Sequence, residues 1–119
     1  ADTDADADND SRYPILQLEF PNLAHEITTL TMFYMKSYGE KWAKSRIRLQ
    51  VLARNANDKD RSYKRLTSDQ LVGFHGKNTS ETYTHKVKLD GVGKGSDLKM
   101  EARLIGGTTF KIMGIGICR

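Results

Sequence analysis

Three histidines, one cysteine and several carboxylates are the side chains of this sequence that could take part in catalysis or bind a metal. The histidines are His25, His75 and His85, and the cysteine is Cys118. Their spacing matches no zinc-binding pattern, and a single cysteine cannot supply a thiolate cluster. An acid–base site of the ribonuclease kind could be assembled with Glu26, Glu81 and Arg103, but any basic domain of this size offers the same set. We therefore predict a non-enzymatic protein with no catalytic residue, no metal site and no cofactor.

Alternating aspartates open the chain and invite comparison with a calcium-binding loop. They occupy positions 2, 4, 6, 8 and 10. If an EF-hand loop is set to begin at Asp4, Asn9 replaces the glycine and Ile15 replaces the bidentate glutamate. An EF-hand is therefore not predicted, although weak cation binding by the aspartates stays open. Residues 1–11 carry no apolar side chain larger than alanine, so we predict a flexible acidic arm ahead of a single domain at 12–119.

The positive charge lies beyond this arm. Residues 12–119 hold all 19 lysines and arginines and ten of the 15 acidic residues, a net charge of +9. A basic domain of this kind favours anionic partners, which here means nucleic acid or an acidic glycan. The residues predicted to bind such a polyanion are Lys41, Lys44, Arg46, Arg48 and Arg54.

Aromatic residues accompany this basic cluster. Trp42, Tyr34 and Tyr38 are candidates to stack on sugars or bases if they lie together at the surface. The other interpretation, which stays open, is that these rings belong to the core.

The elements that must position these residues are predicted as strands, because apolar and polar residues alternate along much of the chain. The pattern is strongest at 82–105. Tyr83, His85, Val87 and Leu89 share one face of the first half, and Leu98, Met100, Ala102 and Leu104 share one face of the second. Further strands are predicted at 13–20, 27–36, 47–54 and 108–118. An antiparallel β-sandwich, immunoglobulin-like or jelly-roll, accounts for this pattern.

Residues 22–38 leave an alternative open, because their apolar residues also fall at helical spacing. If they form a helix, the fold is α+β, with one helix packed on an antiparallel sheet. The density of β-branched and aromatic residues at 27–35 favours the strand.

Several other segments carry weaker signals. Residues 55–65 are predicted as a polar loop, and a helical turn or a short strand follows between 68 and 74. Gly106-Gly107 predicts a hairpin. In the last strand, Phe110 and Ile112 are expected on one face and Met113, Ile115 and Ile117 on the other. Gly114 and Gly116 indicate a bulge or a close backbone approach.

The corner between the two strongest strands resembles a known family. Leu89-x-Gly91-Val92-x-x-Gly95-x-x-Leu98 is similar to the E-to-F corner of fibronectin type III and related immunoglobulin-like domains. The resemblance covers 24 of the 119 residues, and Leu98 stands where that family has a corner tyrosine. It implies a sandwich fold and carries no activity.

The first strand supplies the leading hypothesis about function. Ile15, Leu16, Leu18 and Phe20 form an apolar strand between two prolines, directly after the acidic arm. Such a strand, with Cys118 at the other end of the chain, predicts a subunit that assembles with copies of itself by strand addition, in an extracellular filament, pilus-like fibre or coat. The alternatives are a secreted polyanion-binding module and, more remotely, a small nuclease or toxin.

The expected location is outside the cell. The chain starts at Ala1 rather than Met, which we interpret as removal of a leader, although trimming of the initiator Met alone is the alternative. No apolar run approaches the roughly 20 residues that span a bilayer. Asn78-Thr79-Ser80 is an N-glycosylation sequence, which is used only on a eukaryotic secretory route.

Overall fold

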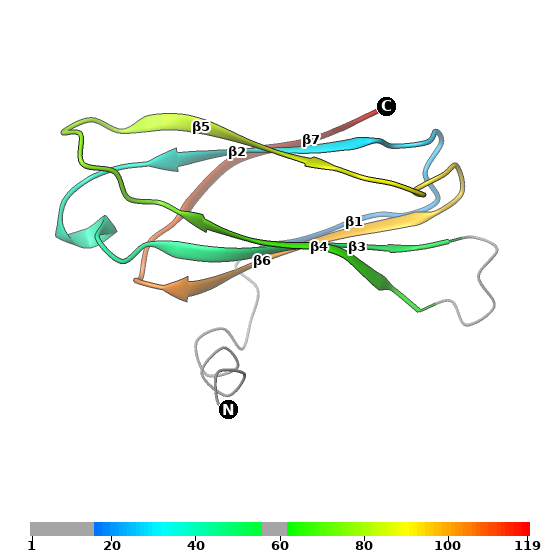
Figure 1. Ribbon diagram of the computed structural model, residues 1–119, viewed down its shortest axis with the longest axis horizontal. Helices are drawn as coiled ribbons and strands as arrows, with labels where there is room; N and C mark the ends of the chain where they lie inside the picture. Colours follow the sequence, from blue (N-terminus) through cyan, green and yellow to red (C-terminus); the bar gives the residue numbers. More distant parts are fainter. Residues whose placement is uncertain (1–15, 56–61) are drawn as a thin grey trace.

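The computed structural model describes residues 16–55 and 62–119, which form an all-β sandwich (Figure 1). The strands are β1 (Leu16–Phe20), β2 (Thr29–Lys36), β3 (Arg46–Arg54), β4 (Lys64–Val72), β5 (Glu81–Lys88), β6 (Asp97–Gly106) and β7 (Lys111–Cys118). The described residues contain one short 3-10 helix, η1 (Glu40–Trp42), and no α-helix. The predicted fold class is therefore confirmed.

The strands form two antiparallel sheets that lie one above the other (Figure 1). Sheet A has the order β1-β6-β3-β4, and sheet B has the order β5-β2-β7. Neither terminal strand pairs with its neighbour in sequence, because β1 lies beside β6 and β7 lies beside β2. The two ends of the described chain thus form the edges of opposite sheets on the same side of the sandwich.

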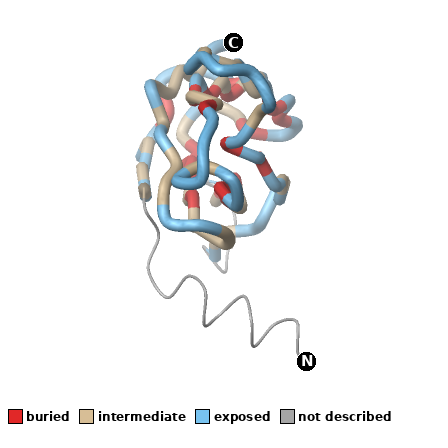
Figure 2. The backbone as a smooth tube through the Cα atoms, turned by 90° about the vertical axis from the view of Figure 1, so that its left-hand side faces the viewer, coloured by how far each residue is buried: buried red, intermediate tan, exposed pale blue. Residues whose placement is uncertain are grey.

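The core fills the space between the sheets. Leu30 and Met32 from sheet B, and Ile47, Leu49 and Met100 from sheet A, have no exposed surface. Along β2, β3 and β6, buried residues alternate with less buried ones, and Figure 2 shows short buried stretches separated by intermediate and exposed ones. This alternation is the reason that a period of two in the sequence predicts these elements.

Residues 29–36 resolve the ambiguity between helix and strand in favour of the strand. In β2 the inward residues Leu30, Met32 and Tyr34 are buried, while Phe33 between them is exposed. A helix would have placed Leu30 and Tyr34 on one face, but it would have required Thr29, Thr31 and the aromatic pair at 33–34 to give up their preference for extended backbone.

The corner at 89–96 carries the chain from sheet B to sheet A. Leu89 and Val92 are buried, and the corner is tied to the segment before β2. The Gly95 amide donates to the Leu23 carbonyl over 2.7 Å, and the Leu23 amide donates to the Ser96 carbonyl over 2.8 Å. The two alternating segments predicted at 82–105 are thus present, but they pair in different sheets.

The structure corrects the prediction for residues 68–74. In place of a helical turn or a short strand, β4 runs over nine residues from Lys64 to Val72. Only Leu71 of these is buried, and the other inward positions of this edge strand hold Thr67 and Asp69. A strand that is mostly exposed needs no apolar alternation, so periodicity gave no signal.

The predicted hairpin at Gly106-Gly107 is wrong. β6 and β7 belong to different sheets, and the glycine pair carries the chain between them across the backbone of Lys44 and Ser45. Gly107 has a φ of 70°, and a Cβ there would lie 2.9 Å from the Lys44 carbonyl carbon. Glycine is required here by close approach and backbone conformation, the same properties that make it common in hairpins.

A bulge in β7 changes which of its residues face the core. The pairing of β2 with β7 shifts between Phe33 and Tyr34, which stand opposite Gly114 and Ile112. Met113 is left at the surface, and Phe110, Ile112, Ile115 and Ile117 all pack on the core. The bulge expected from the glycines is confirmed, whereas the expected division of the apolar residues between two faces is wrong.

The crossing over Lys44 predicts a test of the fold. A Cβ at Gly106 would lie 2.7 Å from the Lys44 carbonyl oxygen, whereas a Cβ at Gly116 would have no atom within 4 Å. Gly106→Ala should therefore lower the free energy of unfolding by about 1–3 kcal/mol, the usual cost of overpacking. Gly116→Ala, its matched control, should leave it unchanged or raise it by up to about 1 kcal/mol. Urea denaturation of both variants measures the difference, and equal midpoints would contradict the close crossing.

Candidate functional site

The sandwich has two sides at which edge strands of the two sheets face each other. β4 and β5 form one side, and β1 and β7 form the other. Edge strands carry unpaired backbone groups, so each side could accept a further strand. The two sides differ in the side chains that point inward from their edges.

Polar residues close the β4/β5 side. Asp69 on β4 and His85 on β5 point inward, opposite Leu49 and Met32 of the central strands. Their side chains meet across the gap between the sheets, with 3.1 Å between His85 Nε2 and Asp69 Oδ2. Inward charged residues on edge strands are a known defence against edge-to-edge aggregation.

A second polar group lies at the end of the same side. His75 Nδ1 is 3.2 Å from the Tyr83 hydroxyl, and His75 Nε2 is 2.5 Å from the Thr79 carbonyl oxygen. The Glu81 carboxylate accepts hydrogen bonds from Lys77 and from the Tyr83 hydroxyl. The hydrogen bond from Lys77 lowers the pKa of Glu81. These contacts fix the chain that joins β4 to β5.

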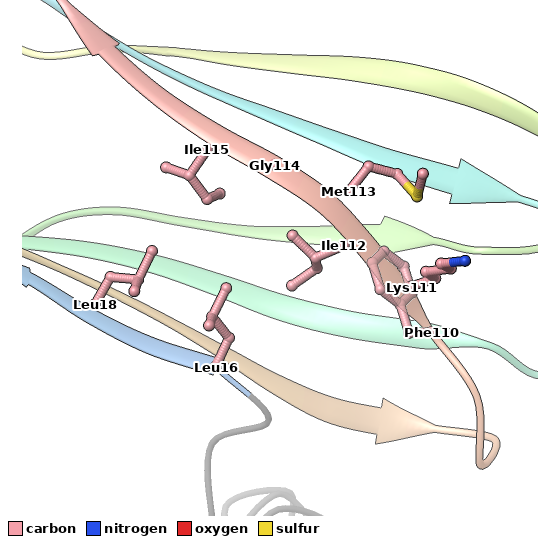
Figure 3. Close-up of a pocket in the computed structure, with 8 residues that line it drawn as sticks. All are labelled: Leu16, Leu18, Phe110, Lys111, Ile112, Met113, Gly114 and Ile115. Carbon is pink, nitrogen blue, oxygen red and sulfur yellow. The ribbon is translucent and has the colours of Figure 1, made fainter.

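The β1/β7 side, in contrast, is lined by apolar side chains. A groove of about 560 Å³ lies between the two edge strands. Leu16 and Leu18 point from β1 toward β7, and Ile112 and Ile115 point from β7 back toward β1 (Figure 3). Its remaining lining residues are Phe110, Lys111, Met113 and Gly114. Lys111 is the single charged residue among them.

The walls of this groove are only partly buried. Leu16, Leu18, Phe110, Ile112 and Ile115 pack against the core without being enclosed by it. Within the described residues, β1 pairs only with β6 and β7 only with β2. The groove therefore combines partly exposed apolar surface with two strand edges that lack a described neighbour, which are the two features that strand addition uses.

The predicted assembly residues are distributed over this side. Leu16, Leu18 and Phe20 face inward in β1, which pairs with β6 of its own chain from Leu16↔Ala102 to Phe20↔Leu98. Cys118 ends β7, opposite Thr29, and is exposed. Ile15 and the acidic arm at 1–11 lie outside the described residues. The apolar strand thus belongs to its own sandwich, and what it offers to a partner is its outer edge.

The predicted polyanion residues do not form one cluster. Lys44 and Arg46 line a hollow of about 330 Å³ where β3 begins. Arg48 lies further along the outer face of β3, opposite Arg103 of β6. Arg54, at the far end of β3, donates to Asp97 from Nε over 3.0 Å and from Nη2 over 2.7 Å.

The surroundings of these basic residues are mixed in charge. The hydrogen bond to Asp97 raises the pKa of Arg54, whose side chain also lies 4.5 Å from the Tyr63 ring centroid. Glu101 stands between the rows of Arg48 and Lys99 on the same outer face. Lys41 is exposed in η1.

The three predicted aromatic residues are not brought together. Tyr34 is buried, and its ring stacks on Phe110 with 5.6 Å between centroids and lies 6.1 Å from Tyr83. Burial raises the pKa of the Tyr34 hydroxyl. Tyr38 is exposed after β2, and Trp42 is half-buried in η1. The ring of Tyr34 is thus part of the core.

The described residues carry no arrangement that could hold a metal. No group of three or more histidine, cysteine, aspartate or glutamate side chains meets in 16–55 and 62–119. The aspartates at positions 2–10, the other candidates for a cation, lie outside this part of the chain. In the same part of the chain, no helix is long and apolar enough to cross a bilayer.

The sequence pattern predicts the β1 wall of the groove but not the β7 wall. Leu16 and Leu18 were predicted to make an intermolecular contact. Ile112 and Ile115 were expected on opposite faces of the last strand, so they were not seen as a common wall. The signal was present in Gly114, whose position next to Met113 marks the bulge that brings both isoleucines inward.

The contrast between the two sides predicts that the polar pair protects β4 and β5 from aggregation. Asp69→Leu with His85→Leu should leave the stability nearly unchanged, because a partly exposed contact between an imidazole and a carboxylate contributes at most about 1 kcal/mol. The double variant should aggregate faster than the wild type on incubation, since its second side is now apolar as well. Light scattering at matched concentration measures this. If the variant is folded and scatters no more than the wild type, the protective role is wrong.

No known protein-family model matches this chain, and no curated protein matches it.

Proposed function

We propose that this protein is a non-enzymatic structural subunit that assembles with copies of itself outside the cell by strand addition at the β1/β7 side. The observation that carries the proposal is the asymmetry between the two sides. The β4/β5 side is crossed by the Asp69–His85 contact, and the β1/β7 side is an open groove lined almost entirely by apolar residues. The chain thus protects one pair of edges and leaves the other pair available.

The proposed occupant of the groove is the N-terminal segment of a second copy. This segment ends at Ile15, directly before the strand that forms one wall of the groove. It supplies two apolar side chains, Tyr13 and Ile15, for the groove. Its five aspartates complement Lys111, the charged residue at the groove. Fifteen residues reach at most about 50 Å when extended, enough to span to a neighbouring domain.

This arrangement gives each copy one donor and one acceptor. The donor segment of one subunit would pair with an edge of the next, which is a heterologous contact. Such contacts generate an open chain unless the rotation between subunits closes it into a ring. A filament, a pilus-like fibre or a coat can all be built from this unit.

Two complementary variants test the proposal. Deletion of residues 1–15 removes the donor, and Leu16→Lys places a charge in the acceptor. Leu16 is half-exposed, so the lysine ammonium can reach water without unfolding the strand. Loss of one large apolar contact should weaken self-association roughly ten- to a hundred-fold. Leu66→Lys is the matched control, because Leu66 is exposed on β4 at the opposite side.

Sedimentation velocity gives the outcome. The wild type and Leu66→Lys should form larger species as concentration rises, and each of the two test variants should remain a folded monomer. When mixed, they should form a one-to-one complex, since one retains the acceptor and the other the donor. A wild type that stays monomeric at high concentration would overturn self-assembly. Assembly that survives the deletion but not Leu16→Lys would show that the edges pair directly and that the N-terminal segment is not the occupant.

A further inference from the structure

Three kinds of residue predominate on the outer face of sheet B. Threonines, lysines and glycines occupy most of its outward positions, with Phe33 near the centre. By the register of the strands these positions are Thr29, Thr31, Phe33 and Met35 on β2, Thr82, Thr84, Lys86 and Lys88 on β5, and Lys111, Gly114, Gly116 and Cys118 on β7. None of them is a carboxylate, so within the described strands every charged residue on this face is a lysine.

This uniform charge contrasts with the outer face of sheet A. There Glu19 stands opposite Lys99, and Glu101 stands opposite Gln50 in the row next to Arg48. The arginines predicted to bind a polyanion therefore lie among carboxylates. The lysines of sheet B were not singled out by the sequence, because they come from two strands far apart in the chain. Pairing of both strands with β2 places them on one surface.

A shallow hollow lies on this face beside Phe33. It has a volume of about 520 Å³ and is lined by Thr31, Phe33, Thr84, Lys86, Gly116, Ile117 and Cys118. Gly116 forms open floor, since a Cβ there would meet no atom within 4 Å. Phe33 is 40% exposed, and its ring lies against Gly114, where a Cβ would be 3.8 Å from its Cδ2. An aromatic ring is thus held at the surface next to an open flat floor.

We propose that this face binds an acidic saccharide chain. The ring of Phe33 supplies an apolar surface for the C–H face of a sugar, and Thr31 and Thr84 supply hydroxyls beside it. Lys86 stands opposite Thr31, diagonal to Phe33 on the same face. It is placed to contact a carboxylate or sulfate on the same sugar, and Lys88 and Lys111 are placed for neighbouring units.

The composition of the face favours a saccharide over single-stranded nucleic acid. Sites for single strands use several aromatic side chains on which successive bases stack. Here one exposed aromatic ring is surrounded by threonine hydroxyls, which match the repeated hydroxyl groups of a sugar chain. The saccharide face shares Lys111 and Gly114 with the lining of the proposed assembly groove, but Phe33, Lys86 and Gly116, the residues varied below, line only the hollow. Either proposal can therefore fail without the other.

The experiment measures binding of a heparin-derived oligosaccharide by isothermal titration calorimetry, with a neutral dextran oligosaccharide and a single-stranded oligonucleotide of equal charge for comparison. The heparin fragment should bind and dextran should not. Phe33→Ala should weaken binding about tenfold, by loss of stacking on the ring. Lys86→Glu should weaken it at least as much, because a like charge then faces the ligand.

Two further variants separate the site from general charge. Gly116→Val fills the hollow without altering charge and should abolish binding, while the open space around Gly116 keeps the fold intact. Arg46→Glu makes the same charge change as Lys86→Glu on sheet A and should leave the affinity unchanged. Circular dichroism establishes that each variant is folded.

Three results would overturn the proposal. If the heparin fragment does not bind, the face has no affinity for acidic saccharides. If the oligonucleotide binds as tightly and Phe33→Ala has no effect, the interaction is only one of charge. If Arg46→Glu abolishes binding while Gly116→Val does not, the polyanion site lies at the beginning of β3.

Discussion

The packing of two apolar sheet faces against each other is the interaction on which the rest of this structure depends. The core layer between the sheets is fully enclosed at Leu30 and Met32 from one sheet and at Leu49 and Met100 from the other. The strands are held in position by the apolar side chains that they contribute to this layer. A sandwich built this way is closed above and below but not at its sides. The inward side chains of the edge strands then determine whether a side of the sandwich is open to a further strand. One side is closed by a polar contact between Asp69 and His85, and the other presents apolar residues to a groove.

The outer faces of the two sheets differ in how their charged residues are distributed. Sheet A mixes arginine, lysine and glutamate, so its charges are largely offset by their neighbours. Sheet B gathers its lysines on a face without carboxylates, although the sequence gives no sign that Lys86 and Lys111 belong together. A net positive charge therefore says little about where an anion would bind. The position of an anion site depends on which strands lie in the same sheet, because strand pairing brings together basic residues from distant segments of the chain.

Strands with one face on the core could be predicted from the sequence, because every second residue faces the core and must be apolar. This leaves an alternation of apolar and polar residues. β1, β2, β3, β5, β6 and β7 were predicted in this way. β4 was missed because its inward positions are Thr67, Asp69 and Leu71, of which only Leu71 is apolar. β5 is also an edge strand, but its inward positions include Tyr83 and Val87. The crossing at Gly106-Gly107 was mistaken for a hairpin, because local sequence does not report which sheet the next strand will join. For the same reason, one wall of the groove was found and the other was not. The bulge at Met113 reverses the faces of the residues that follow it.

The pairing of the terminal strands has a consequence for the order in which the chain can fold. Leu16 pairs with Ala102, and Thr29 pairs with Cys118, so these contacts join residues at opposite ends of the chain. Contacts that close such long loops form late, and sandwiches dominated by them fold in milliseconds to seconds. As a ribosome makes the chain, the first strand has no partner until β6 has been synthesised. During that interval β1 can pair with the β6 of a completed neighbour but not with its own, so a longer interval favours exchange of β1 between molecules.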